Sequence, residues 1–94
     1  MKKVKTVKWN GHTFDVMRAE YQVDDSLYLG LYENGEWYCD ITVHLDFLVG
    51  DYAFVDTNNF PDAEKFLKAT GLGEPTGRTR QSGFCTYPLY AFNL

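Results

Sequence analysis

The sequence predicts an α+β fold: a mostly antiparallel, twisted sheet of about five to six strands with one α-helix packed on one face. Three observations support this prediction: two Asn-Gly turns set between alternating strand patterns, one segment with helical periodicity, and an aromatic C-terminal segment. The chain has 94 residues, the length of one domain, so we expect residues 1–94 to form a single α+β domain. Hydrophobic residues make up 45% of the chain, which is enough to build a core.

The first predicted element is a β-hairpin over residues 4–17, where apolar and polar side chains alternate on both sides of Asn10-Gly11. Asn-Gly tolerates positive φ at both central positions of a type I′ turn, the turn that suits a two-residue hairpin loop. The resulting register gives one largely apolar face and one polar face. The predicted cross-strand pairs are Trp9 with His12, Val7 with Phe14 and Lys5 with Val16.

A second hairpin is predicted from residues 27–33 and 36–45, which flank Asn34-Gly35. Its register would place Glu33 directly opposite Glu36, an unfavourable like-charge pair that a longer loop would relieve. One face would carry Leu27, Leu29 and Leu31, and the other Tyr32, Trp37, Cys39, Ile41, Val43 and Leu45.

One helix is predicted near residues 60–70, because apolar residues recur there at helical spacing and Gly71 follows as a stop signal. Glu64 and Lys68 are four residues apart and are expected to pair on the outer face. The signals at its N-terminus are Asn59 as the cap, Pro61 in the first turn and Asp62 as the partner in a capping box. The helix should pack on the sheet.

Two further strands are predicted, from Tyr52 to Val55 and over residues 84–94. Residues 73–83 hold three Gly, one Pro and no large apolar residue, so we expect an exposed loop between the helix and the last strand. Pro88 cannot donate to a strand ladder, which argues for an edge position or a bulge.

Charge is strongly segregated along the chain. The net charge is −4, but residues 9–75 hold all 13 Asp and Glu against three Lys and Arg. An acidic surface of this kind keeps a protein in solution, and it also attracts basic partners and repels nucleic acid. No apolar run has the ~20 residues that a membrane helix needs, and no signal peptide is evident, so we expect a cytoplasmic protein with no membrane partner.

No residue pattern indicates catalysis. Cys39 and Cys85 belong to no metal-ligand spacing and are expected to be buried thiols. Cys85 with His12 or His44 could form a nucleophile and base pair, but no local motif supports it. Acidic pairs such as Asp24-Asp25 lack the spacing of a metal loop. We therefore expect a protein that is not an enzyme and that holds no cofactor and no metal.

Three segments resemble a known family: Ala53 to Asn59, Gly71 to Gly77, and Ser82 to Tyr90. They are similar to domain-of-unknown-function family 4313, short bacterial proteins associated with mobile elements of gut anaerobes. The resemblance is closest in the C-terminal half, and it implies an accessory protein of a plasmid, transposon or phage without an established activity. It also draws attention to the segments Asp56 to Asn59 and Phe84 to Tyr90, which contains Tyr87, because their residue types suit both turn building and recognition.

The leading functional hypothesis is a non-enzymatic module whose acidic, aromatic-rich surface binds another protein, with a homodimer along a sheet edge as a further option. The first alternative is an acidic DNA mimic that inhibits a nucleic-acid enzyme. The less favoured alternatives are a small enzyme that uses Cys85 or a carboxylate pair, and a nucleic-acid binder that uses Lys2, Lys3, Lys5, Lys8, Arg78 and Arg80. The candidate interaction residues are Arg78 and Arg80, which could hold a phosphate or an acidic segment, and Asp56, Asn58, Trp37, Tyr87 and Tyr90.

Overall fold

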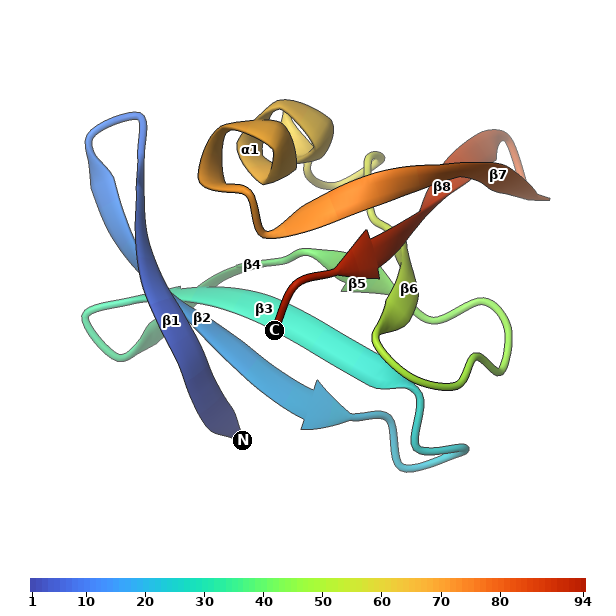
Figure 1. Ribbon diagram of the computed structural model, residues 1–94, viewed down its shortest axis with the longest axis horizontal. Coiled ribbons are helices and arrows are strands. Elements are labelled where there is room, and N and C mark those ends of the chain that lie inside the picture. The colour runs from blue at the N-terminus through green and yellow to red at the C-terminus, as the bar shows by residue number, and fades with distance from the viewer.

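The computed structural model describes residues 1–94 as two antiparallel four-stranded sheets and one helix (Figure 1). The first sheet has the order β1-β2-β3-β4, with β1 Lys2–Trp9, β2 His12–Glu20, β3 Leu27–Glu33 and β4 Glu36–Asp40. The second has the order β5-β6-β8-β7, with β5 Thr42–Val43, β6 Tyr52–Val55, β7 Gly73–Ser82 and β8 Cys85–Phe92. The helix α1 spans Ala63–Thr70. The α+β class agrees with the prediction, but the single sheet of five to six strands does not.

The predicted strand over residues 36–45 is divided at Ile41, where the chain passes from the first sheet to the second. The Ile41 amide donates to the Leu29 carbonyl, and the Ile41 carbonyl accepts from the Asp56 amide, both within 2.9 Å. This fully buried residue therefore joins the two sheets. The division creates two sheets where the sequence pattern indicated one.

The first hairpin has the predicted register, with Trp9 opposite His12 and Val7 opposite Phe14. Asn10 and Gly11 have φ values of 49° and 80°, as a type I′ turn requires. The pairing slips by one residue only between Lys3 and Lys5, near the open end.

The second hairpin contains a bulge that was not predicted. Leu31 pairs with Cys39 whereas Tyr32 pairs with Trp37, so Tyr38 is the extra residue. Beyond the bulge, each side chain of β4 lies on the opposite face of the sheet from the one predicted. This is because the extra residue shifts the alternation of side chains between the two faces by one position. Cys39 thus lies on the face of Leu31, and the predicted assignment to the opposite face was wrong. The like-charge pair of Glu33 and Glu36 is present as predicted.

The predicted loop over residues 73–83 is the ten-residue strand β7, which pairs with β8. It is an edge strand, and every residue after Gly73 is exposed, so it needs no apolar face. Its backbone hydrogen bonds, rather than burial, hold it in place. Pro88 of β8 lies just beyond the end of the β6 pairing at Leu89, so no β6 residue stands opposite it.

The helix is shorter than predicted and begins differently. Asp62 occupies the N-cap position but makes no side-chain cap bond. Asn59 does not cap α1; its backbone amide and side-chain amide both donate to the Asp56 carboxylate. The helix ends as predicted, with Gly71 in the left-handed region at φ 69°. The Glu64 carboxylate accepts a hydrogen bond from Tyr90 of β8, and it forms no ion pair with Lys68, contrary to the prediction.

The main core joins both sheets and α1. Strand residues such as Phe14 and Leu29 pack with Phe66 of α1 and with Tyr90 of β8. A smaller cluster lies on the other face of the second sheet, where Phe54, Tyr87 and Leu89 are covered by Leu45 and Leu48 of the segment before β6. Figure 1 shows α1 beside the β1–β2 hairpin and β7, and α1 contacts both.

Candidate functional site

A groove of about 470 Å³ opens where the tip of the β1–β2 hairpin, β4 and the turn before α1 come together. Half of the residues that line it are hydrophobic, and none is Lys or Arg. We call it the aromatic groove; its lining residues are Trp9, Asn10, His12, Phe14, Tyr38, Cys39, Asn59, Phe60, Pro61 and Asp62. Its volume lies in the range of sites that bind small ligands.

Local features of the two hairpins position two walls of the aromatic groove. The type I′ turn brings Trp9 opposite His12, and the bulge in β4 presents Tyr38. His12 stacks on Phe14 at a ring distance of 5.1 Å, and Tyr38 lies 4.7 Å from Phe14. Tyr38 is nevertheless 47% exposed, so one side of its ring is available to a partner.

The third wall comes from the turn that leads into α1. Phe60 and Trp9 both pack on Phe66, with ring distances of 5.6 and 5.8 Å. Asp56 forms the turn by accepting two hydrogen bonds from Asn59. Trp9 and Phe60 are therefore held by Phe66, and His12 and Tyr38 pack on the buried Phe14.

A histidine and a glutamate meet at the edge of the groove. The Nδ1 atom of His12 lies 3.1 and 3.0 Å from the two carboxylate oxygens of Glu33. The contact gives the Glu33 carboxylate a hydrogen-bond partner at the position where Glu33 pairs with Glu36 across the strands. It also fixes the orientation of the His12 ring against Phe14.

Cys39, and not Cys85, shares the groove with His12. Burial raises the pKa of the Cys39 thiol to about 11, so almost none of it is thiolate at neutral pH. Both His12 and His44 bond carboxylates, His44 through a 2.9 Å contact with Asp24. A cysteine nucleophile activated by histidine therefore has little geometric support. Both cysteines are half-buried, less than the buried thiols that we predicted.

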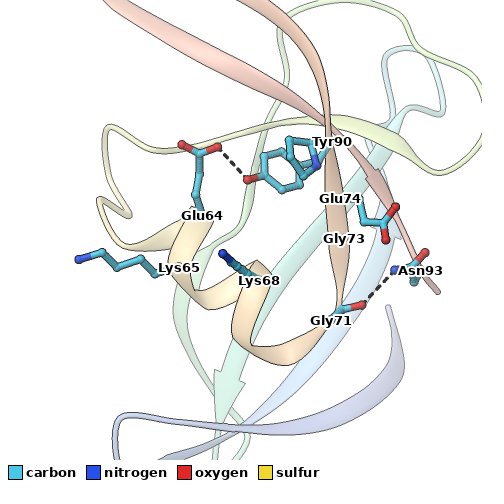
Figure 2. Close-up of a pocket in the computed structure, with 9 residues that line it drawn as sticks. Glu64, Lys65, Lys68, Gly71, Gly73, Glu74, Tyr90 and Asn93 are labelled. Carbon is cyan, nitrogen blue, oxygen red and sulfur yellow. Dashed lines mark hydrogen bonds between the residues drawn. The ribbon is translucent and has the colours of Figure 1, made fainter.

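A second groove, of about 600 Å³, lies between α1 and β7 (Figure 2). The Tyr90 hydroxyl donates a 2.7 Å hydrogen bond to Glu64 there, and Asn93 donates to the Gly71 carbonyl at 3.0 Å. Its lining contains both cations and anions, with Lys65 and Lys68 near Glu64. The groove therefore favours neither a cationic nor an anionic ligand. Among its lining residues only one is hydrophobic. We regard it as the weaker candidate.

The predicted interaction residues do not form one surface. Arg80 is half-exposed and forms an ion pair with Asp46. The hydrogen bond that Arg80 donates to Asp46 raises the pKa of the Arg80 guanidinium. Arg78 is exposed nearby on β7. Trp37 is 60% exposed and donates to Asp40, and Asn58 is exposed in the turn before α1. Asp56, Tyr87 and Tyr90 are buried and serve the turn and the two cores.

Sequence reasoning missed the residues of the aromatic groove. The Asn-Gly turn placed Trp9 beside His12, and this was the one available signal. The exposure of Tyr38 depends on a bulge, and the approach of Phe60 depends on tertiary packing. Several other exposed apolar residues lie on turns and loops, namely Val23, Phe47, Val49 and Phe84, and Tyr52 is exposed on β6.

No three His, Cys, Asp or Glu side chains are grouped so that they could hold a metal ion. The structure contains no helix with the length and apolar character needed to cross a membrane.

Comparison with known proteins places the chain in a family. Residues 13–94 match the family described as Domain of unknown function (DUF4313). The match begins in β2 and so reaches well into the N-terminal half, where the sequence resemblance was only general. No curated protein and no solved structure matches the chain.

Proposed function

The chain belongs to the DUF4313 family, whose description assigns no function, and on that premise we propose that it is a protein-binding module that docks an extended segment of a partner in the aromatic groove. The single observation that carries the proposal is Tyr38. Its ring is 47% exposed at the mouth of a groove whose other rings are fixed by the core. Tyr and Trp anchors in well-packed pockets supply most of the binding energy at protein interfaces.

The chemistry of the groove supports binding rather than turnover. Its lining offers rings, two amide side chains and one free carboxylate, and the only thiol in it is poorly ionised. Rigid rings lower the entropy lost on binding, which favours recognition. The accessory role in a mobile element stays a prediction.

The acidic residues give less support to a DNA mimic, which needs an array of free carboxylates on one surface. Eight of the 13 acids bond other groups of the protein: Asp15, Asp24, Glu33, Asp40, Asp46, Asp51, Asp56 and Glu64. These acids stabilise turns, strands and ion pairs. Only a minority is left to imitate phosphates.

The sheet edges give little support to dimerisation by strand pairing. β1 is rich in lysine and bulged, β4 has five residues and a bulge, β5 has two residues, and β7 contains Pro75 and an irregular register. Lysine, proline, bulges and short length all oppose edge-to-edge pairing. Protection of a sheet edge thus explains the lysines of β1 without binding to nucleic acid.

The proposal is tested by site-specific photocrosslinking in the source organism. A benzoylphenylalanine replaces Tyr38 in one protein and Tyr52 in another, because Tyr52 is equally exposed, at 46%, and does not line the groove. We expect one defined crosslinked species from position 38 and none from position 52. Equal crosslinking at both positions, or none at position 38, would contradict the proposal.

A further inference from the structure

The aromatic groove combines the half-exposed ring of Tyr38 with a negative charge. Asp62 is exposed at its rim, and its carboxylate makes no bond to the helix N-terminus. Glu33 does not line the groove and its carboxylate contacts His12 of the lining, and no Lys or Arg lines the groove. A ligand that enters the groove therefore meets one free carboxylate at the rim and an aromatic interior.

Aromatic rings attract cations through the negative potential of their faces. Trp provides the strongest face, followed by Tyr and Phe, and the attraction grows when the cation leaves water. The groove offers Trp9, Tyr38 and Phe60 within one hollow. Long cationic side chains also carry an apolar stem that can cover rings while the charged head reaches a carboxylate.

These features point to one class of ligand. We propose that the aromatic groove binds a lysine or arginine side chain from an extended segment of the partner, with the aliphatic stem against the rings and the charged head near Asp62. The inference rests on the proposed function, because it identifies the chemistry of the segment that docks there. A proline-rich segment, which also favours aromatic grooves, would not need the carboxylate.

The test uses three short extended peptides that differ at one central position, which holds lysine, norleucine or glutamate. Binding is followed by NMR through the indole signals of the two tryptophans. Trp9 lines the groove, whereas Trp37 lies outside it and donates to Asp40, so Trp37 is an internal control. We expect the lysine peptide to shift the Trp9 signal and to bind roughly tenfold more tightly than the norleucine peptide.

A matched pair of variants tests the carboxylate. Asp62→Asn keeps a residue that suits a helix N-cap, so the fold should be retained. Asp25→Asn removes another exposed acid, one that is outside the groove. We expect the first variant to weaken lysine-peptide binding severalfold and the second to leave it unchanged.

The outcomes separate the two claims. If the norleucine peptide or a proline-rich peptide shifts the Trp9 signal as strongly as the lysine peptide does, the groove is a docking site. The proposal that it binds a cationic side chain is then wrong. If no peptide shifts Trp9 while crosslinking from position 38 succeeds, the cationic inference again fails and the proposed function stands. If both experiments are negative, both claims fail.

Discussion

The Tyr28 hydroxyl donates a 2.6 Å hydrogen bond to the Asp40 carboxylate, and the ring of Tyr28 reaches this partner by lying across Gly30. A Cβ atom at position 30 would lie 2.1 Å from the Tyr28 oxygen and 2.8 Å from its Cζ. Asp40 also accepts from the Trp37 indole at 2.9 Å. Three strand residues are thus tied together at the end of β4, close to the bulge that presents Tyr38.

The first prediction concerns this glycine. Gly30→Ala should lower the free energy of unfolding by about 1–3 kcal/mol, because the methyl group displaces the Tyr28 ring from Asp40. Denaturant unfolding measures the change. In a Tyr28→Ala background the same substitution should cost little, since the clashing ring is gone. An equal cost in both backgrounds would show that the ring is not the cause.

The second prediction concerns the link between the second sheet and α1. Tyr90→Phe should lower the free energy of unfolding by about 1 kcal/mol, because it removes the hydrogen bond to Glu64 and leaves the ring in place. The matched control is Tyr52→Phe, whose hydroxyl is on an exposed side chain and which should change stability by less than about 0.5 kcal/mol. A loss at position 52 as large as that at position 90 would contradict this account of the link.

How far the sequence predicts the fold differs from element to element. Both Asn-Gly turns were predicted, because type I′ geometry is encoded by two adjacent residues. The strand break at Ile41 was not, since residues 36–45 alternate without interruption and the break depends on bonds to Leu29 and Asp56. Strand β7 has no hydrophobic periodicity because both its faces are exposed, so its pattern is that of a loop.

The candidate site was less predictable than the fold. Two of its walls follow from local features, the turn at Asn10-Gly11 and the bulge at Tyr38, but only the turn has a sequence signature. The third wall depends on the packing of Phe60 and Trp9 on the same core ring, Phe66. Because these residues are far apart in the sequence, the pattern of neither segment alone predicts their contact.

The third prediction concerns acid stability. His44 and then Ser26 donate hydrogen bonds to the Asp24 carboxylate, and these lower the pKa of Asp24 in the folded protein. A lowered folded-state pKa contributes stability above the unfolded pKa of about 3.9, and this contribution is lost as the pH falls through the folded value.

Asp24→Asn isolates that charge, because asparagine still accepts a hydrogen bond from the Ser26 amide. The free energy of unfolding is measured against pH for both proteins. We expect the variant to be less stable at neutral pH and the difference to close in acid. A difference that does not depend on pH would rule out the charge of Asp24 as its source.

The fourth prediction concerns the thiol in the groove. In a Cys85→Ser protein, the rate at which iodoacetamide alkylates Cys39 should rise with each pH unit up to about 11, because burial raises the pKa of the thiol. The reaction is followed by mass spectrometry. A plateau near the ordinary thiol pKa of about 8.5 would show that Cys39 is not held in a buried site.

The most direct test of the central claim is the affinity of the crosslinked partner for two tyrosine variants of equal exposure. Tyr38→Ala should weaken binding roughly tenfold or more, as expected for an interface anchor, whereas Tyr52→Ala should change it less than about twofold. Calorimetry with the purified partner measures both constants. Unchanged binding by Tyr38→Ala, or an equal loss in the two variants, would contradict a docking site in the aromatic groove.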